Sequence, residues 1–237
     1  MKRIYTFSIF LISFLFFSNF SNKNLFSYHL IPNYSLKDGE FFLNKYSLDF
    51  LNYKLKIADK NLIPKLKIDK KGNYFYSYKK NKFSQNLSLI EIEDFINNPP
   101  VFENERLFLK NIIHLLHDLG INIIMINFKN SNIAGEWDYK NKYIKLNLNL
   151  INSGTKIFTT VLNHEVIHIA QSCMNGRISS KPKKIGLKLN LDKEKNYFLS
   201  SKIYNHKPKK ILLFEKEAYS YQDDLNFGLQ LIRKYCF

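Results

Sequence analysis

TKIFTTVLNHEVIHIAQSC, residues 155–173, is the most informative stretch of the chain. We predict one helix here, because apolar residues surround most of its circumference, as is typical of a helix buried in a core: Val161, Leu162, Val166, Ile167 and Ala170. His164 and His168 are four residues apart and therefore share one face. Two imidazoles at this spacing can bind one zinc ion, and Glu165 can reach a water bound to that ion. The alternative is a pair of histidines that are simply hydrogen-bonded inside a core, where unpaired polar groups cost free energy.

The chain has 237 residues, which is enough for one catalytic domain with appendages, and 45% of them are hydrophobic, as is ordinary for a globular protein. The net charge of +16 favours an anionic partner, either nucleic acid or a membrane surface. The lysines are scattered, however, and Arg, which nucleic-acid sites use for bidentate contacts, is rare. Lys, Asn, Ile and Phe are abundant together, as in AT-rich coding. We attribute the charge to this composition and do not expect nucleic acid as a partner.

Residues 1–20 have the pattern of a targeting segment. Lys2 and Arg3 are followed by an uncharged run from Ile4 to Phe20. Its length lies between that of a signal-peptide core and a short membrane span, and no A-x-A-like cleavage site follows. A cleaved signal peptide and a retained N-terminal membrane anchor both stay open. We therefore expect an exported protein, periplasmic or secreted, or one anchored to the membrane through this segment.

Cys173 and Cys236 are the two cysteines of the chain. In an exported protein an even pair favours a disulfide, which would join the last helix to the end of the 155–173 helix. Two buried free cysteines are the alternative.

Residues 21–100 form a poorly defined N-terminal region without a sustained helical period. Alternation in 65–68 and 73–78 around a turn at 69–72 predicts a hairpin, and 88–96 predicts a short helix. Pro99-Pro100 predicts the boundary of a second domain, residues 101–237.

The second domain has sharper periodicity. We predict a helix at 105–119 ended by Gly120, strands at 121–128, 133–139 and 143–150, and the 155–173 helix with Thr155 as N-cap. A basic loop, 176–210, and a helix at 211–235 follow. Helices and strands in this order predict an α+β fold.

At this point the chain resembles the zincin metallopeptidases. The shared features are the order of elements over residues 102–237 and the H-E-x-x-H motif of 164–168. The resemblance implies a zincin-like minimal metalloprotease domain: a helix, a small mixed sheet, the motif helix and a C-terminal ligand helix. It also implies that the strand at 143–148 binds the substrate backbone as an added strand.

The third zinc ligand has two candidates, Glu215 and Glu217, since catalytic zinc sites use three protein ligands. Zincins with a glutamate ligand often carry E-x-x-A on the second helix. The segment from Glu215 to Ala218 resembles this pattern and indicates Glu215, with Glu217 as the alternate. We expect one zinc ion per chain.

The expected zinc mechanism gives roles to further side chains. Glu165 is expected to be general base and then general acid. His206, Tyr219 and Tyr221 are candidates for stabilising the oxyanion, and Gln171 can orient a ligand or line the cleft. The expected function is a zinc metallopeptidase acting on a peptide or protein substrate. The alternative is a catalytically inactive zincin-fold binding module at the membrane surface.

Overall fold

A computed structural model describes residues 36–237 except 38, 79–86, 131, 201–203 and 205–207, and residues 36–237 form one compact unit. The targeting segment predicted at residues 1–20 lies outside the described residues. None of the described helices has the length and apolar character that crossing a bilayer requires.

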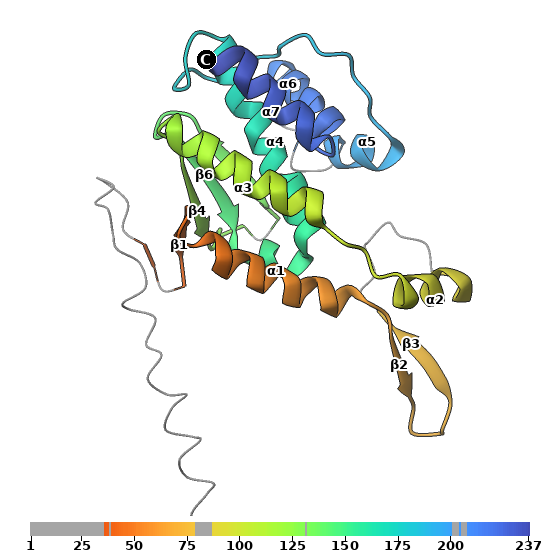
Figure 1. Cartoon of the computed structure of the whole chain (residues 1–237). Helices are drawn as coiled ribbons and strands as arrows, with labels where there is room; N and C mark the ends of the chain where they lie inside the picture. The colour runs from red at the N-terminus through yellow and green to blue at the C-terminus, as the bar shows by residue number, and fades with distance from the viewer. Residues whose placement is uncertain (1–35, 38, 79–86, 131, 201–203, 205–207) are drawn as a thin grey trace, which may run out of the picture. The chain divides into compact units, whose positions relative to one another are not determined.

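The described part of the chain mixes helices with a four-stranded sheet and a separate two-stranded hairpin, which confirms the predicted α+β class (Figure 1). In chain order the elements are β1 (Phe41–Leu43), α1 (Leu48–Leu62), β2 (Lys65–Ile68), β3 (Tyr74–Ser77), α2 (Leu89–Asn97), α3 (Glu103–Asp118), β4 (Asn122–Ile126), β5 (Gly135–Asp138), β6 (Tyr143–Asn147), the 3₁₀ helix η1 (Leu148–Ser153), α4 (Thr155–Met174), α5 (Lys193–Leu199), α6 (Lys209–Tyr221) and α7 (Leu225–Cys236).

The four-stranded sheet has the order β1-β4-β6-β5. β4 and β6 are parallel, with Ile123 opposite Ile144, whereas β1 and β5 are antiparallel to their neighbours. β6 is hydrogen-bonded to β4 on one side and to β5 on the other, so no edge is free for a substrate strand. The expectation that the substrate backbone adds to residues 143–148 is therefore wrong. β5 is the edge strand on that side. The indole Nε1 of Trp137 on β5 donates to Ser172 Oγ on α4 at 2.9 Å and fastens the strand to that helix.

Helix α4 runs through the hydrophobic core, as its apolar circumference predicts. Thr155 is its first residue and not its N-cap, which corrects the sequence prediction. The cap comes from α1 instead: the Asp59 carboxylate accepts from Thr155 N at 2.7 Å and from Thr155 Oγ1 at 2.6 Å. Gly154, with φ +86°, permits this approach, because a Cβ there would meet Asp59 Oδ1 at 2.8 Å.

Helix α1 and strand β1 were not expected from the sequence. β1 pairs with β4, and the buried side chains of α1 join the same core as α4: Leu48, Leu51 and Leu55. The structure therefore places no domain division at Pro99-Pro100; β1 and α1 belong with residues 101–237 in one unit.

The predicted hairpin is present as β2 and β3, and the predicted short helix as α2. Ser88 caps α2 in a capping box with Glu91. None of the described residues from Ile63 to Leu107 belongs to the main hydrophobic core, so this segment contributes little to the packing around α4.

The C-terminal helix predicted at 211–235 is two helices, α6 and α7. Asn163 Nδ2 on α4 donates to the carbonyls of Tyr221, Gln222 and Asp224, and Asp224 caps α7 by accepting from the N–H of Phe227. The break lets α7 lie alongside α4 (Figure 1).

The disulfide predicted between Cys173 and Cys236 is formed in the structure and joins the ends of α4 and α7.

Candidate metal centre

Helix α4 buries both histidines of the motif and the glutamate between them. His164, Glu165 and His168 are 8%, 5% and 6% exposed. The four-residue spacing places the two imidazoles one turn apart, and their Nε2 atoms lie 3.1 Å from each other. The motif therefore forms a single buried cluster of ring nitrogens.

Glu215 completes this cluster from helix α6. Its Oε2 lies 3.4 Å from His164 Nε2 and 3.6 Å from His168 Nε2. These three residues form the one group of at least three metal-ligating side chains found among the described residues. The structure thus brings the predicted third ligand to the two histidines.

Glu217, the alternate ligand, has a different partner set. Its carboxylate is buried and accepts from the N–H groups of Ile185, Gly186 and Leu187 at 2.8, 2.6 and 2.8 Å. It also accepts from Gln171 Nε2 at 3.1 Å. These bonds hold the segment after α4 against α6, so Glu217 is a structural anchor and its assignment as a ligand is wrong.

Two glutamine amides fix the orientation of the imidazoles. Gln171 Oε1 lies 2.7 Å from His168 Nδ1, and Gln222 Oε1 lies 3.0 Å from His164 Nδ1. An amide oxygen only accepts hydrogen bonds, so each Nδ1 carries its hydrogen and each neutral ring presents an Nε2 lone pair to the cluster. Gln171 cannot turn, since its Nε2 donates to Phe214 O. Gln171 therefore orients the His168 ring, a predicted ligand, whereas Gln222 was not foreseen.

The charges in this cluster depend on one another. Burial alone would lower the pKa of His168, but the facing Glu215 carboxylate outweighs burial and raises that pKa to about 9. Burial likewise opposes ionisation of Glu215, yet the two histidines hold its pKa far below its usual value. Without a metal, the Glu215 carboxylate therefore favours a proton on His168, so the point where the three side chains meet attracts a cation.

Glu165 occupies the side of α4 that faces strand β5. A Cβ added to Gly135 would lie 2.8 Å from Glu165 Oε1, so glycine is needed for this close approach. Burial raises the pKa of Glu165, and the nearby histidines oppose that shift without cancelling it. The carboxyl group therefore binds a proton more readily than a carboxyl group in water. Gly135 is another residue of the site that the sequence did not single out.

Two tyrosines border the cluster. The Tyr219 ring packs edge-on against the His164 ring, with 4.7 Å between centroids. Tyr204 Oη donates to Glu215 Oε2 at 3.3 Å and lies 3.3 Å from Tyr219 Oη. Burial raises the pKa of both hydroxyls, so they remain hydrogen-bond donors at neutral pH. Nothing in the sequence around Tyr204 marks it for this position.

The structure does not bring the two remaining oxyanion candidates, His206 and Tyr221, to the cluster among the residues it describes. His206 lies outside the described residues. Tyr221 Oη donates to the carbonyl of Lys188 at 2.8 Å.

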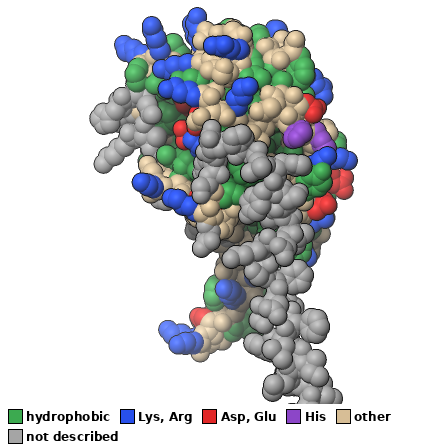
Figure 2. Space-filling view, turned by 90° about the vertical axis from the view of Figure 1, so that its left-hand side faces the viewer, with side chains coloured by type: hydrophobic (Ala, Val, Ile, Leu, Met, Phe, Trp, Pro, Cys, Tyr) green, Lys and Arg blue, Asp and Glu red, His purple; other side chains and the backbone are tan. Residues whose placement is uncertain are grey.

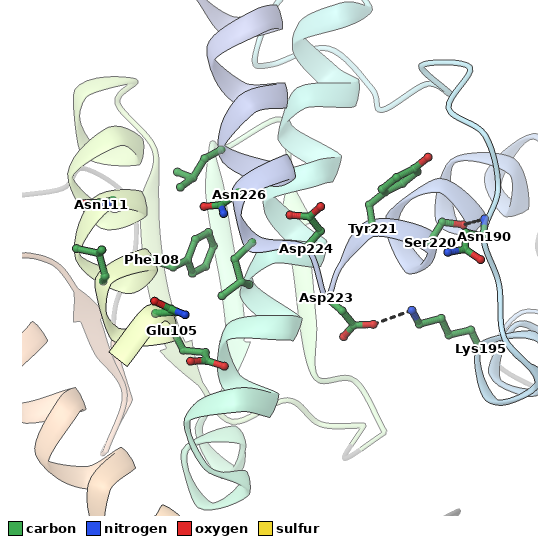
Figure 3. A pocket seen from close by; sticks show the side chains of 14 residues that line it. Glu105, Phe108, Asn111, Asn190, Lys195, Ser220, Tyr221, Asp223, Asp224 and Asn226 are labelled. Carbon is green, nitrogen blue, oxygen red and sulfur yellow. Dashed lines mark hydrogen bonds and ion pairs between the residues drawn. The ribbon is translucent and has the colours of Figure 1, made fainter. Parts of the chain in front are cut away.

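A separate hollow of about 750 Å³ opens beside the α6–α7 turn (Figure 3). It lies between the start of α3, the segment near Asn190 and this turn, and the Asp223–Lys195 ion pair of 2.6 Å forms part of its wall. None of the three clustered ligands lines it. The hollow is linked to the candidate centre through the chain alone: Gln222, which binds His164, lies in sequence between two of the lining residues, Tyr221 and Asp223.

Comparisons with known proteins assign no activity to this arrangement. No curated protein and no solved structure matches the chain. One family, described as a domain of unknown function (DUF8637), matches residues 90–237, a range that contains α3 to α7 and the whole candidate centre. Since the match covers more than half of the sequence, the protein belongs to this family.

Proposed function

We propose that this protein is a zinc-dependent metallopeptidase of the zincin type, exported or held at the membrane by its N-terminal segment. The observation that carries the proposal is the meeting of His164, His168 and Glu215 within 4.8 Å in the interior, with Glu165 beside them. Two imidazoles and one carboxylate are the ligand set of many catalytic zinc sites, which leave a fourth position open.

The separations in the cluster fit one tetrahedral zinc ion. Ligand atoms at zinc–nitrogen and zinc–oxygen distances of about 2.0–2.2 Å would lie roughly 3.3–3.5 Å from one another. The three observed separations are 3.1, 3.4 and 3.6 Å. With both Nδ1 atoms donating to glutamines, the Nε2 atoms of the neutral rings and the Glu215 carboxylate meet as acceptors, so the cluster needs a cation there, either a proton or a metal ion.

The remaining chemistry belongs to side chains of this chain. A zinc ion, when bound, supplies a Lewis acid that polarises a carbonyl and acidifies water. Glu165, with its raised pKa, accepts the proton of the attacking water and returns it to the leaving amine. The hydroxyls of Tyr204 and Tyr219 are donors beside Glu215 and are our candidates for stabilising the developing oxyanion.

Substrate binding is assigned to strand β5. β5 is the edge of its sheet, and Gly135 at its start lies against Glu165. A peptide added along this edge would pass the general base, with backbone hydrogen bonds supplying affinity. This geometry supports a peptide or protein substrate.

The decisive experiment combines metal analysis with a peptidase assay on purified full-length protein. We expect one zinc per wild-type chain, none in His168→Ala, and full zinc with no hydrolysis in Glu165→Gln. Absence of zinc from the wild type, or proteolysis by Glu165→Gln equal to wild type, would refute the proposal. Zinc without hydrolysis of any peptide by the wild type would instead support the inactive binding module.

A further inference from the structure

The hairpin of β2 and β3 has an apolar face that remains exposed. In its register Leu66 lies opposite Tyr76 and Ile68 opposite Tyr74, and residues paired across strands share a face. Leu66, Ile68 and Tyr74 are between 54% and 70% exposed. Leu66, Ile68, Tyr74 and Tyr76 thus form one apolar face, whereas the opposite face is mixed: Lys65, Lys67, Ser77 and Phe75, the last 47% exposed.

Four lysines belong to the same hairpin. Two lie on the opposite face of the hairpin and two in its turn: Lys65, Lys67, Lys70 and Lys71. Asp69 is the one acidic residue of the hairpin, and its carboxylate already accepts the N–H groups of Lys71 and Asn73 at 2.8 and 2.9 Å. Figure 2 shows basic and hydrophobic side chains side by side at the lower end of the view, where the hairpin lies in Figure 1. The net charge of the hairpin is +3.

The rest of the chain gives this hairpin little support. An isolated two-stranded hairpin is marginally stable in water, and none of its residues joins the main core. Helix α2 adds to the exposed apolar area, since Leu89 and Ile90 in its first turn are exposed. A hydrogen bond of 3.1 Å from Leu87 N to Tyr78 Oη holds α2 near the base of the hairpin. An exposed apolar area of this kind marks a binding surface.

We propose that the hairpin docks onto an anionic lipid bilayer, with the Leu66–Ile68–Tyr74–Tyr76 face in the interfacial region and the four lysines at the headgroups. Tyrosine rings favour the bilayer interface, and lysine stems extend along apolar surface while their ammonium groups reach anionic headgroups. A single cationic and aromatic element suits a lipid surface better than a protein groove, which would need matching acidic pockets. The uncharged run from Ile4 to Phe20, predicted to bring this chain to a membrane, agrees with this partner. The inference does not depend on the zinc site.

The test places a fluorescent probe on the hairpin of the full-length protein, because residues 4–20 can bind lipid in every variant. Tyr74→Trp adds an indole to the exposed face, while the native Trp137, 7% exposed, contributes a constant buried signal. With vesicles rich in phosphatidylserine we expect a blue shift and quenching by brominated acyl chains. Vesicles of phosphatidylcholine alone should produce much weaker changes. The position control is Tyr46→Trp. Tyr46 is exposed and lies just before the first residue of α1, at the end of that helix away from the hairpin, so this indole should not be quenched.

Charge reversal then tests the lysines. In the Tyr74→Trp protein, changing all four hairpin lysines to Glu should lower hairpin insertion at least about tenfold, since each Lys near an anionic surface contributes on the order of a factor of five. The matched control reverses four exposed lysines elsewhere and should retain insertion: Lys183, Lys184, Lys209 and Lys210.

Three results would overturn the proposal. The first is no quenching at position 74 with either lipid, and the second is equal loss in the charge-reversed protein and its control. The third is a dimer in solution that Leu66→Ser and Ile68→Ser convert to monomers without any effect on vesicle insertion. That result would make the hairpin a contact between copies of this chain.

Discussion

Zinc affinity should rise steeply with pH, because the ligand cluster holds a proton that zinc must displace. The Glu215 carboxylate raises the pKa of His168 to about 9, against about 6.5 for an unfolded histidine. The metal-free protein therefore gains stability from this pair below about pH 6.5 and loses it as the pH rises through 9. Stabilisation by zinc runs in the opposite direction, since zinc binds the deprotonated ring.

The size of the effect follows from one proton released per zinc bound. Between pH 6.5 and 8.5 the apparent affinity should rise about tenfold per pH unit, which is roughly 100-fold or about 3 kcal/mol in all. His168 has a side chain only 7% exposed, so solvent screens this interaction little. Competition with a chelator of known zinc affinity, measured at each pH, gives the slope directly. Thermal unfolding with and without zinc gives the same quantity as a stability difference.

Two variants separate the proton at the cluster from other pH effects. Glu215→Gln removes the carboxylate that retains the proton and should flatten the slope as well as weaken binding. His117→Gln changes an exposed histidine on α3, outside the cluster, and should leave the wild-type slope intact. An affinity that stays level or falls from pH 6.5 to 8.5 in the wild type would refute this account of the cluster.

Three further predictions concern the scaffold. Replacing Cys173 and Cys236 by Ser opens a loop with a sequence separation of 63 and should cost about 4 kcal/mol in urea unfolding; a loss below about 1 kcal/mol would contradict the constraint. Gly135→Ala should displace Glu165 and lower kcat of peptide hydrolysis at least about tenfold at unchanged zinc content, and unchanged kcat would count against the close approach. Glu217→Gln should lower the free energy of unfolding by about 2–4 kcal/mol, because the amide NH2 that replaces one carboxylate oxygen is a donor and cannot accept from Ile185 N–H and Gln171 Nε2. Zinc content should stay at one, and loss of zinc with unchanged stability would reverse the assignment of Glu217.

Local patterns sufficed to predict that His164 and His168 share a helix face, and the resemblance indicated Glu215, but neither predicted the residues around this cluster. The spacing of His164 and His168 on one helix is a property of four consecutive residues, so it survives any tertiary arrangement. Gln222 is different: it reaches His164 only because the C-terminal helix breaks, and the break depends on Asn163 binding three carbonyls of the turn. No periodicity in 211–235 indicates a break, since both halves favour helix. Tyr204 likewise reaches Glu215 through tertiary structure alone.

Helix α1 shows how solvent-facing apolar residues can conceal a helical period. Its buried residues follow steps of three, four and three along the chain: Leu48, Leu51, Leu55 and Ala58. Phe50, Tyr53 and Ile57 on the same helix are exposed. With apolar side chains on both sides, the contrast between faces that identifies an amphipathic helix is weak. Only packing against η1 and α4 distinguishes the two faces.

Helix α1 also ties the residues before position 90 to the segment that the family match covers, residues 90–237. The match begins at residue 90, beyond α1 and β1, although the candidate centre lies entirely within it. Yet the first N–H and hydroxyl of α4 are bound by Asp59, and Arg106 on α3 binds the same carboxylate at 3.0 Å. One acidic residue outside the matched segment therefore caps the helix that carries His164 and His168. Members of the family that lack an equivalent of α1 must satisfy this helix terminus in another way, because a buried helix start with unbound N–H groups is costly.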